Sequence, residues 1–154
     1  MSHIRTQLRD AVIERLRTSG AFALTATKLR RGLGFDRDQF PLATVAVTDK
    51  SDTVGRGQIG QRPQTRTMTV EVRVALHLED VDLMNGKLDD LGVTVEQLLA
   101  DPRELGVGSF KEWSYLGSAD LDDGMAEFGF VELPMIFTGT LSTLEGNPSA
   151  NLHP

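Results

Sequence analysis

The sequence contains no cysteine and has few histidines and large aromatic residues. Among its 154 residues are three histidines, one tryptophan and one tyrosine. The lack of cysteine excludes a disulfide scaffold and a cysteine nucleophile. The fold must therefore rest on one hydrophobic core, which a chain of this length can bury without a metal or a disulfide.

Long hydrophobic runs are also missing from the sequence. No apolar segment approaches the roughly 20 residues that a transmembrane helix needs. The first ten residues alternate between charged and apolar types and lack the apolar centre of a signal peptide. We therefore expect a soluble protein that is made in the cytoplasm.

The net charge of −6 is unevenly distributed along the chain. Residues 1–78 carry 13 of the 16 Lys and Arg and 7 of the 22 acidic residues, whereas residues 79–154 carry the remaining 3 and 15. An acidic protein is poorly suited to general nucleic-acid binding, which depends on neutralising phosphates. Two interpretations of the asymmetry remain. Sequence halves need not be spatial halves, or the subunit has a basic and an acidic flank that suit head-to-tail packing with its own copies.

Apolar periodicity predicts the first half of the fold. An amphipathic helix follows Ser2, the expected N-cap, and stops at Ser19-Gly20. Strands are predicted over 22–29 and 42–48. The clearest pattern runs from Thr67 to Leu78, where apolar residues alternate with other types and predict a long, half-buried strand.

The second half begins with a helix that starts at Glu79-Asp80 and ends at Asp101-Pro102. Two glycines inside this helix, Gly86 and Gly92, cost about 1 kcal/mol each and allow a break near Gly92. The residues expected on its buried side are Met84, Leu88, Leu91, Val95 and Leu98.

Two further strands are predicted over 110–116 and 127–140, separated by an acidic turn. Pro134 indicates an edge position or a bulge in the last strand, because proline cannot donate to a sheet. Trp113 and Tyr115 share one face of their strand and pack either on the core or against a partner.

This order of elements favours an α+β fold rather than a doubly wound sheet. We expect a single domain with a mainly antiparallel or mixed sheet of about five strands packed against two helices. The domain covers 1–141 with a long flexible loop at 49–64, and a polar C-terminal tail covers 142–154.

The loop contains G-x-G-x-x-G from Gly55 to Gly60, the spacing of a dinucleotide-binding turn. Such a turn needs a helix that opens at its last glycine, but here a polar segment and a strand follow. We therefore interpret these glycines as part of a strand-to-strand loop. It is either a solvated loop without a role or an arm that orders on contact with an acidic partner.

No catalytic, cofactor or metal site is predicted. The three histidines are scattered, and His77 is expected on the polar face of its strand. Asp89-Asp90 and Asp122-Asp123 are interpreted as solvated acidic pairs, because adjacent acids on a helix or in a turn point apart. We therefore expect a protein that is not an enzyme.

The order of segments as a whole resembles a known family. The helix "IRTQLRDAVIERL" leads to a strand, then to "PLATVAV", a long loop and the alternating "MTVEVRVALHL". An acidic helix "DLMNGKLDDLGVTVEQLL" and the strand "EFGFVELPMIFTGT" complete it. From Ile4 to Thr140 this pattern resembles the tail-terminator proteins, also called tail-completion or minor tail proteins, of long-tailed bacteriophages and related gene transfer agents.

The resemblance implies a structural role in a virion tail or neck. Members of this family form a hexameric ring on the head-proximal end of the tail tube, stop tube growth and bind head-completion proteins, and DNA later passes through the ring. If the chain acts in this way, Arg56, Gln58, Arg62 and Arg66 are the candidate contacts to a neighbouring subunit or the tube. Asp122 and Asp123 are the candidates for an acidic partner or lumen surface. The alternatives are another neck component, such as a head-completion or connector protein, and a non-viral α+β binding module.

Overall fold

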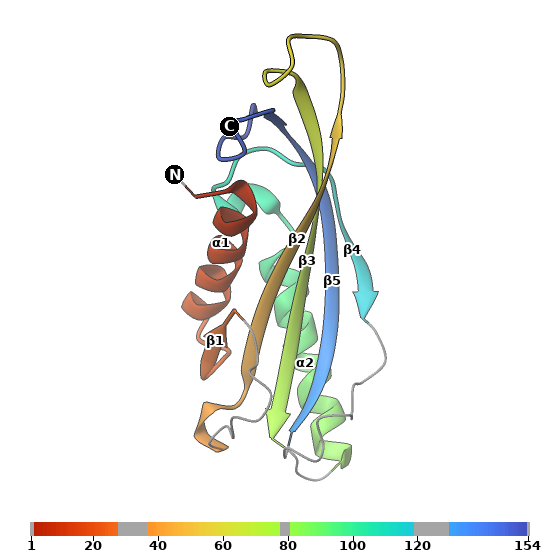
Figure 1. The fold of residues 1–154 in the computed structure, drawn as a ribbon. Coiled ribbons are helices and arrows are strands. Elements are labelled where there is room, and N and C mark those ends of the chain that lie inside the picture. Colours follow the sequence, from red (N-terminus) through yellow and green to blue (C-terminus); the bar gives the residue numbers. More distant parts are fainter. Residues whose placement is uncertain (1, 28–36, 78–80, 119–129, 154) are drawn as a thin grey trace.

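The structure is a computed structural model that describes residues 2–27, 37–77, 81–118 and 130–153 (Figure 1). Two α-helices and five strands form one domain, which confirms the predicted α+β class. In chain order, the elements are α1 (Ile4–Thr18), β1 (Leu24–Ala26), the 3-10 helix η1 (Arg37–Gln39), β2 (Leu42–Thr53), β3 (Pro63–His77), α2 (Val81–Leu98), the 3-10 helix η2 (Pro102–Leu105), β4 (Lys111–Ser118) and β5 (Phe130–Leu144).

The five strands form one mixed sheet with the order β1-β2-β3-β5-β4. Only β1 and β2 are parallel, and every other neighbouring pair is antiparallel. The strands β2, β3 and β5 are long and continuously paired, so they form the spine of an elongated molecule (Figure 1).

Both helices pack against one face of this sheet. Successive strand residues point to opposite faces, and the residues of β3 in the main core are every second one, from Met68 to Leu76. The helices cover this face with four fully buried residues of α1 and with Leu88 and Val95 of α2. The alternation predicted for this strand is thus confirmed and places the core.

The N-cap of α1 lies one residue later than predicted. His3, not Ser2, is the N-cap, and its Nδ1 accepts a hydrogen bond of 3.0 Å from the backbone N–H of Arg5. A neutral imidazole nitrogen can thus satisfy one of the orphan donors of the first turn. The predicted apolar stripe is confirmed, with full burial at Ile4, Leu8, Val12 and Leu16.

The helix α2 runs through Gly92 without a break. Its buried residues Leu88, Val95 and the following Leu99 anchor it to the core. Tertiary packing of an apolar face contributes more to helix stability than propensity does, and it offsets the cost of the two glycines. The side chain of Met84 lies outside the described residues.

The strands β2 and β3 are longer than the sequence predicts. The expected loop at 49–64 is in fact β2 up to Thr53, a connection over residues 54–62, and β3 from Pro63. Asp49 to Thr53 pair in register with Met68 to Gln64. The sequence did not predict this pairing, because these residues are polar and an exposed strand end shows no alternation of apolar residues.

The strand β5 is an interior strand, so the predicted edge position of Pro134 is wrong. It pairs with β3 over its full length and with β4 from Met135 to Thr140. The bulges of this region lie in β4, between Lys111 and Ser114 and between Tyr115 and Gly117. Within the described residues, pairing with β4 ends at Met135. Pro134 lies just beyond it, where its missing N–H is tolerated.

Trp113 and Tyr115 pack on the core, which decides between the two expectations for them. The Tyr115 ring lies 4.9 Å and the Trp113 ring 6.2 Å from the Phe137 ring, measured between centroids. The indole N–H of Trp113 donates to the Leu99 carbonyl at 2.8 Å. A side chain on Gly139 would lie 2.6 Å from the indole, so glycine is needed there.

The C-terminal residues are attached to the domain rather than loose. Residues up to Leu144 belong to β5. The carbonyl of Pro148 accepts a 2.8 Å hydrogen bond from the N–H of Ile4, and the carbonyl of Ser149 accepts one of 2.7 Å from the Gln7 amide. These backbone contacts, which composition cannot reveal, tie the tail to the start of α1.

Candidate assembly interface

The hairpin formed by β2 and β3 extends past the hydrophobic core at one end of the molecule (Figure 1). We call residues 54–62, which connect the two strands, the hairpin tip. Residues 51–61 are all exposed. Just below the tip, where the two strands leave the core, lies a group of paired polar side chains that we call the base cluster. Its members are Arg5, Asp49, Gln64, Arg66 and Thr143.

Arg66 is the centre of the base cluster. Its guanidinium contacts the Asp49 carboxylate at 2.6 Å and the Thr143 hydroxyl at 2.8 Å, and it donates to the Gln64 side-chain oxygen at 3.2 Å. The Arg66 and Asp49 side chains are only 10% and 9% exposed. The second Asp49 oxygen accepts a 3.2 Å bond from Arg5 at the start of α1. Every buried charge here has a partner, which is the condition for such a pair to be tolerated.

The base cluster continues the face of the sheet that carries the core. Asp49 lies opposite Met68, and Arg66 lies opposite Leu141, both of which are core residues. The core therefore ends in a layer of satisfied polar groups and not in an abrupt apolar edge. This layer connects α1, β2, β3 and β5 at the point where the hairpin emerges.

His3 lies beside the base cluster, and the charges of that cluster affect its pKa. Partial burial lowers the pKa of His3 from its ordinary value of 6.5, Asp49 raises it, and the positive charges of Arg66 and Arg5 lower it further. The net shift of this pKa is downward. The neutral form is also the one that caps α1, because a protonated Nδ1 could not accept the Arg5 N–H.

The hairpin tip contains a tight turn at its outer corner. The N–H of Gln61 donates to the carbonyl of Gln58 at 3.0 Å, and Gly60 has φ +91°. A positive φ at the third position is the requirement of a type II turn, which explains the last glycine of the G-x-G-x-x-G sequence. The residue before it, Ile59, is 84% exposed, and Val54 is 43% exposed.

Glu145, just after β5, holds this turn in place. One of its carboxylate oxygens accepts the Gly60 N–H at 2.6 Å, and the other contacts the Arg62 guanidinium at 2.8 Å and the Thr53 hydroxyl at 3.4 Å. The hydrogen bonds from Arg62 and then from the Gly60 N–H hold the pKa of Glu145 below its ordinary value. The tip is thus connected to the sheet by a charged side chain as well as by its own strands.

The four candidate contact residues have different surroundings. Arg56 and Gln58 are exposed on the tip. Arg62 is paired with Glu145, and Arg66 is buried in the base cluster. The structure therefore brings together only part of the predicted set on one accessible surface. Asp122 and Asp123 lie outside the described residues.

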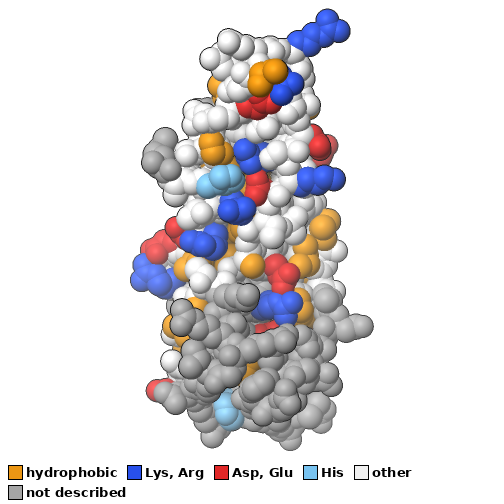
Figure 2. All heavy atoms as spheres, viewed as in Figure 1, with side chains coloured by type: hydrophobic (Ala, Val, Ile, Leu, Met, Phe, Trp, Pro, Cys, Tyr) orange, Lys and Arg blue, Asp and Glu red, His pale blue; other side chains and the backbone are white. Residues whose placement is uncertain are grey.

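Sequence reasoning missed Ile59 on the tip and Glu145, which holds the tip in place. Ile59 is an isolated aliphatic residue within a polar, glycine-rich stretch, and this isolation could have indicated an exposed apolar side chain. Glu145 belongs to the segment expected to be a loose tail, and nothing in the sequence connects it with Gly60. Figure 2 shows hydrophobic and Lys or Arg side chains together at this end of the molecule.

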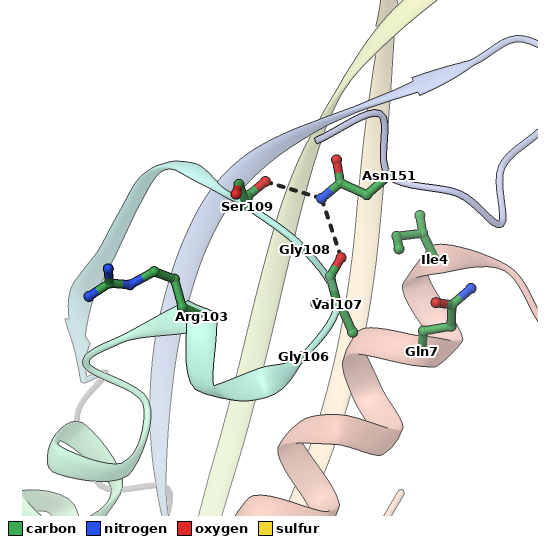
Figure 3. Close-up of a pocket in the computed structure, with 8 residues that line it drawn as sticks. All are labelled: Ile4, Gln7, Arg103, Gly106, Val107, Gly108, Ser109 and Asn151. Carbon is green, nitrogen blue, oxygen red and sulfur yellow. Dashed lines mark hydrogen bonds between the residues drawn. The ribbon is translucent and has the colours of Figure 1, made fainter. Parts of the chain in front are cut away.

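A second candidate location is a pocket of about 540 Å³ between the start of α1, the segment after η2 and the C-terminal residues (Figure 3). The Asn151 amide in it donates to the carbonyls of Val107 and Ser109 at 3.3 and 3.1 Å. Arg103 on its rim is paired with Asp101 at 2.8 Å. These polar groups are satisfied within the chain, so they do not converge on a ligand.

Other types of site find little support among the described residues. No group of His, Asp and Glu side chains in that part of the chain could hold a metal ion. None of its helices is both long and apolar enough to cross a membrane. His77 is half-buried, with its ring edge-on to Phe40 at 5.8 Å, and is not the surface residue that was expected.

Comparison with known proteins gives likenesses among solved structures only. No protein-family model matches the chain, and no curated protein matches it. Among solved structures it is similar to a chain described as "Virion of native gene transfer agent (GTA) particle", with 9% identity, a TM-score of 0.41 and coverage of 92% of each chain. Because likeness at this level says little about function, the charges and contacts of the hairpin are the stronger guide.

Proposed function

We propose that this protein is a structural virion component that caps the head-proximal end of a phage-type tail tube as a ring. In this role it stops tube growth and joins the tail to the head. The proposal combines the resemblance of the sequence to tail-terminator proteins with the geometry of the hairpin. Its partners are further copies of the chain, the tail-tube protein and a head-completion protein. By resemblance, the ring is a hexamer.

The observation that carries the proposal is the exposed hairpin tip. Ile59 is 84% exposed at the corner of a turn that Glu145 holds in place. Burying an aliphatic side chain of this size contributes roughly 1.5–3 kcal/mol. A turn that is already ordered loses little conformational entropy on binding, so most of that gain is available to a contact. This arrangement is suited to protein–protein assembly.

The charge of the chain fits a ring through which DNA passes. With a net charge of −6, the protein has no excess of basic groups to hold phosphates, so DNA can slide past it.

Electron microscopy of particles produced without this protein tests the proposal. The producing strain carries a deletion of the coding sequence, and a plasmid that restores the intact sequence serves as the control. We expect tail tubes of irregular, overgrown length that are not attached to heads. Tails of one normal length that remain unattached would instead assign the protein to another neck component, and normal attached tails would contradict both assignments.

A further inference from the structure

The outer side of α2 carries an exposed apolar residue surrounded by acids. Val93 is 51% exposed. Asp89, Asp90 and Glu96 lie three or four positions from it, so all three flank it on the helix surface, and all are exposed. Among the described residues, none of these carboxylates takes part in an ion pair. We call these four residues the α2 patch.

The negative charge of this patch comes from its carboxylates and not from the helix end. The last turn of α2 contains Glu96 and no basic residue of its own. Helix C-termini carry a partial negative charge and favour cations nearby. Arg15 of α1 already meets this preference, because its Nε donates to the Leu98 carbonyl at 3.1 Å. The three exposed carboxylates therefore supply the negative potential of the α2 patch.

The hairpin tip has the complementary character. It presents Ile59, which is 84% exposed, and the exposed Arg56, which has no ion-pair partner among the described residues. An apolar side chain with a neighbouring cation matches an apolar side chain ringed by carboxylates. The tip cannot satisfy the patch of its own chain, because it projects from the end of the sheet, away from α2 (Figure 1).

We propose that the hairpin tip of one copy docks on the α2 patch of the next copy. Ile59 then packs against Val93, and the Arg56 guanidinium lies among the carboxylates that flank Val93. Donor and acceptor surfaces are different parts of one chain, so the contact is heterologous and closes into a ring when the rotation per subunit permits. The biological setting of this contact rests on the proposed function. The contact itself defines the two surfaces through which neighbouring copies bind.

A charge-exchange experiment tests this pairing. In one variant, Arg56→Glu places an acid on the tip, and in the other, Asp89→Lys with Asp90→Lys makes the patch basic. Each variant alone sets like charges against each other, so we expect each to lose self-association. When the two are produced together, every contact in an alternating assembly again joins opposite charges, and association should return. Circular dichroism and the melting temperature of each purified variant are the controls for folding.

Crosslinking measures the contact directly, because the chain has no cysteine of its own. The double variant Ile59→Cys with Val93→Cys should give a ladder of disulfide-linked oligomers when lysates of particle-producing cells are oxidised. The matched control pairs Ile59→Cys with Leu116→Cys, since Leu116 is also an exposed apolar residue, at 63%. We expect no ladder from the control.

The outcomes separate this contact from the proposed function. Absence of the ladder, or failure of the two folded charge variants to associate when combined, would overturn the docking proposal. Self-association of either charge variant alone at the level of the unmodified protein would overturn it as well. The role as a tail terminator is tested separately, by the tail length in the deletion strain.

Discussion

Arg66 and Arg56 belong to the same short segment of sequence but occupy opposite environments. Arg66 is buried at the base of the hairpin and paired with Asp49, whereas Arg56 is exposed on the tip. Sequence analysis placed them together as loop cations. The difference shows that strand register, and not the density of charge in a segment, decides whether an arginine contributes to folding or remains available for assembly.

The two ends of the hairpin also differ in what holds them. The base is fixed by a network that includes α1, β3 and β5, and breaking it leaves a buried charge without a partner. The tip is fixed by one turn and by Glu145, and its outer side chains contact little of their own chain. Mutations at the base should therefore act on stability, and mutations at the tip on association.

The largest expected effect is that of Arg66→Ala. Removing one partner of a buried ion pair costs about 3–5 kcal/mol, and here the buried Asp49 would keep only its 3.2 Å contact with the half-exposed Arg5. Urea unfolding followed by circular dichroism measures the loss in the free energy of unfolding. A loss below about 1 kcal/mol, the range of an exposed ion pair, would show that the base cluster is not the structural anchor described above.

Gly60→Ala should have the next largest effect. With φ at +91°, alanine would be strained in the turn, at a cost of about 1–3 kcal/mol. Gly86→Ala is the matched control, since Gly86 is exposed in α2 with open space around it. There the same substitution should stabilise the protein by about 1 kcal/mol. Thermal unfolding of both variants should therefore shift in opposite directions, and a parallel shift would contradict the turn geometry.

A smaller effect, limited in pH, is expected at His3. Its pKa is lower in the folded chain than its ordinary value of 6.5, so the unfolded chain binds a proton first as the pH falls. The stability that the neutral cap contributes is therefore present above that pH and is lost below it. His3→Asn keeps a capping side chain but does not titrate.

The measurement is the difference in the free energy of unfolding between the two proteins from pH 7.5 to 5. Because the two proteins share all other titratable groups, a change in this difference with pH reports the titration of His3. The unmodified protein should lose stability relative to the His3→Asn variant as the pH falls through about 6.5. A constant difference over that range would rule out the proposed link between protonation and the cap.

The smallest expected effect on stability is that of Arg56→Ala. Its side chain is exposed and lacks an ion-pair partner among the described residues, so the free energy of unfolding should change by less than about 0.5 kcal/mol. The same urea titration used for Arg66→Ala measures it. A loss comparable to that of Arg66→Ala would remove the distinction between tip and base.

Periodicity predicted the parts of the fold that bury apolar residues. The stripe of α1 and the alternation of β3 were confirmed because burial imposes those patterns on the sequence. The strand ends beyond the core were missed, since the pairing of Asp49 to Thr53 depends on a partner strand and leaves no local pattern. The interior position of β5 depends on topology, which Pro134 alone could not reveal.

The candidate site was predicted only in outline. The sequence indicated a basic, glycine-rich connection between two strands, and Arg56 and Gln58 do lie exposed on it. It could not distinguish these residues from Arg66, because the burial of Arg66 depends on Thr143 in a distant strand. The contact between Glu145 and Gly60 is long-range in the same sense.

The central claim is that the hairpin tip serves assembly and not folding, and one measurement tests it most directly. The deletion strain is complemented with the Arg56→Ser, Ile59→Ser double variant, after the purified variant has been shown to melt at the temperature of the unmodified protein. We predict overgrown tail tubes that are not attached to heads, as in the deletion itself. Tails of normal length attached to heads would contradict the claim.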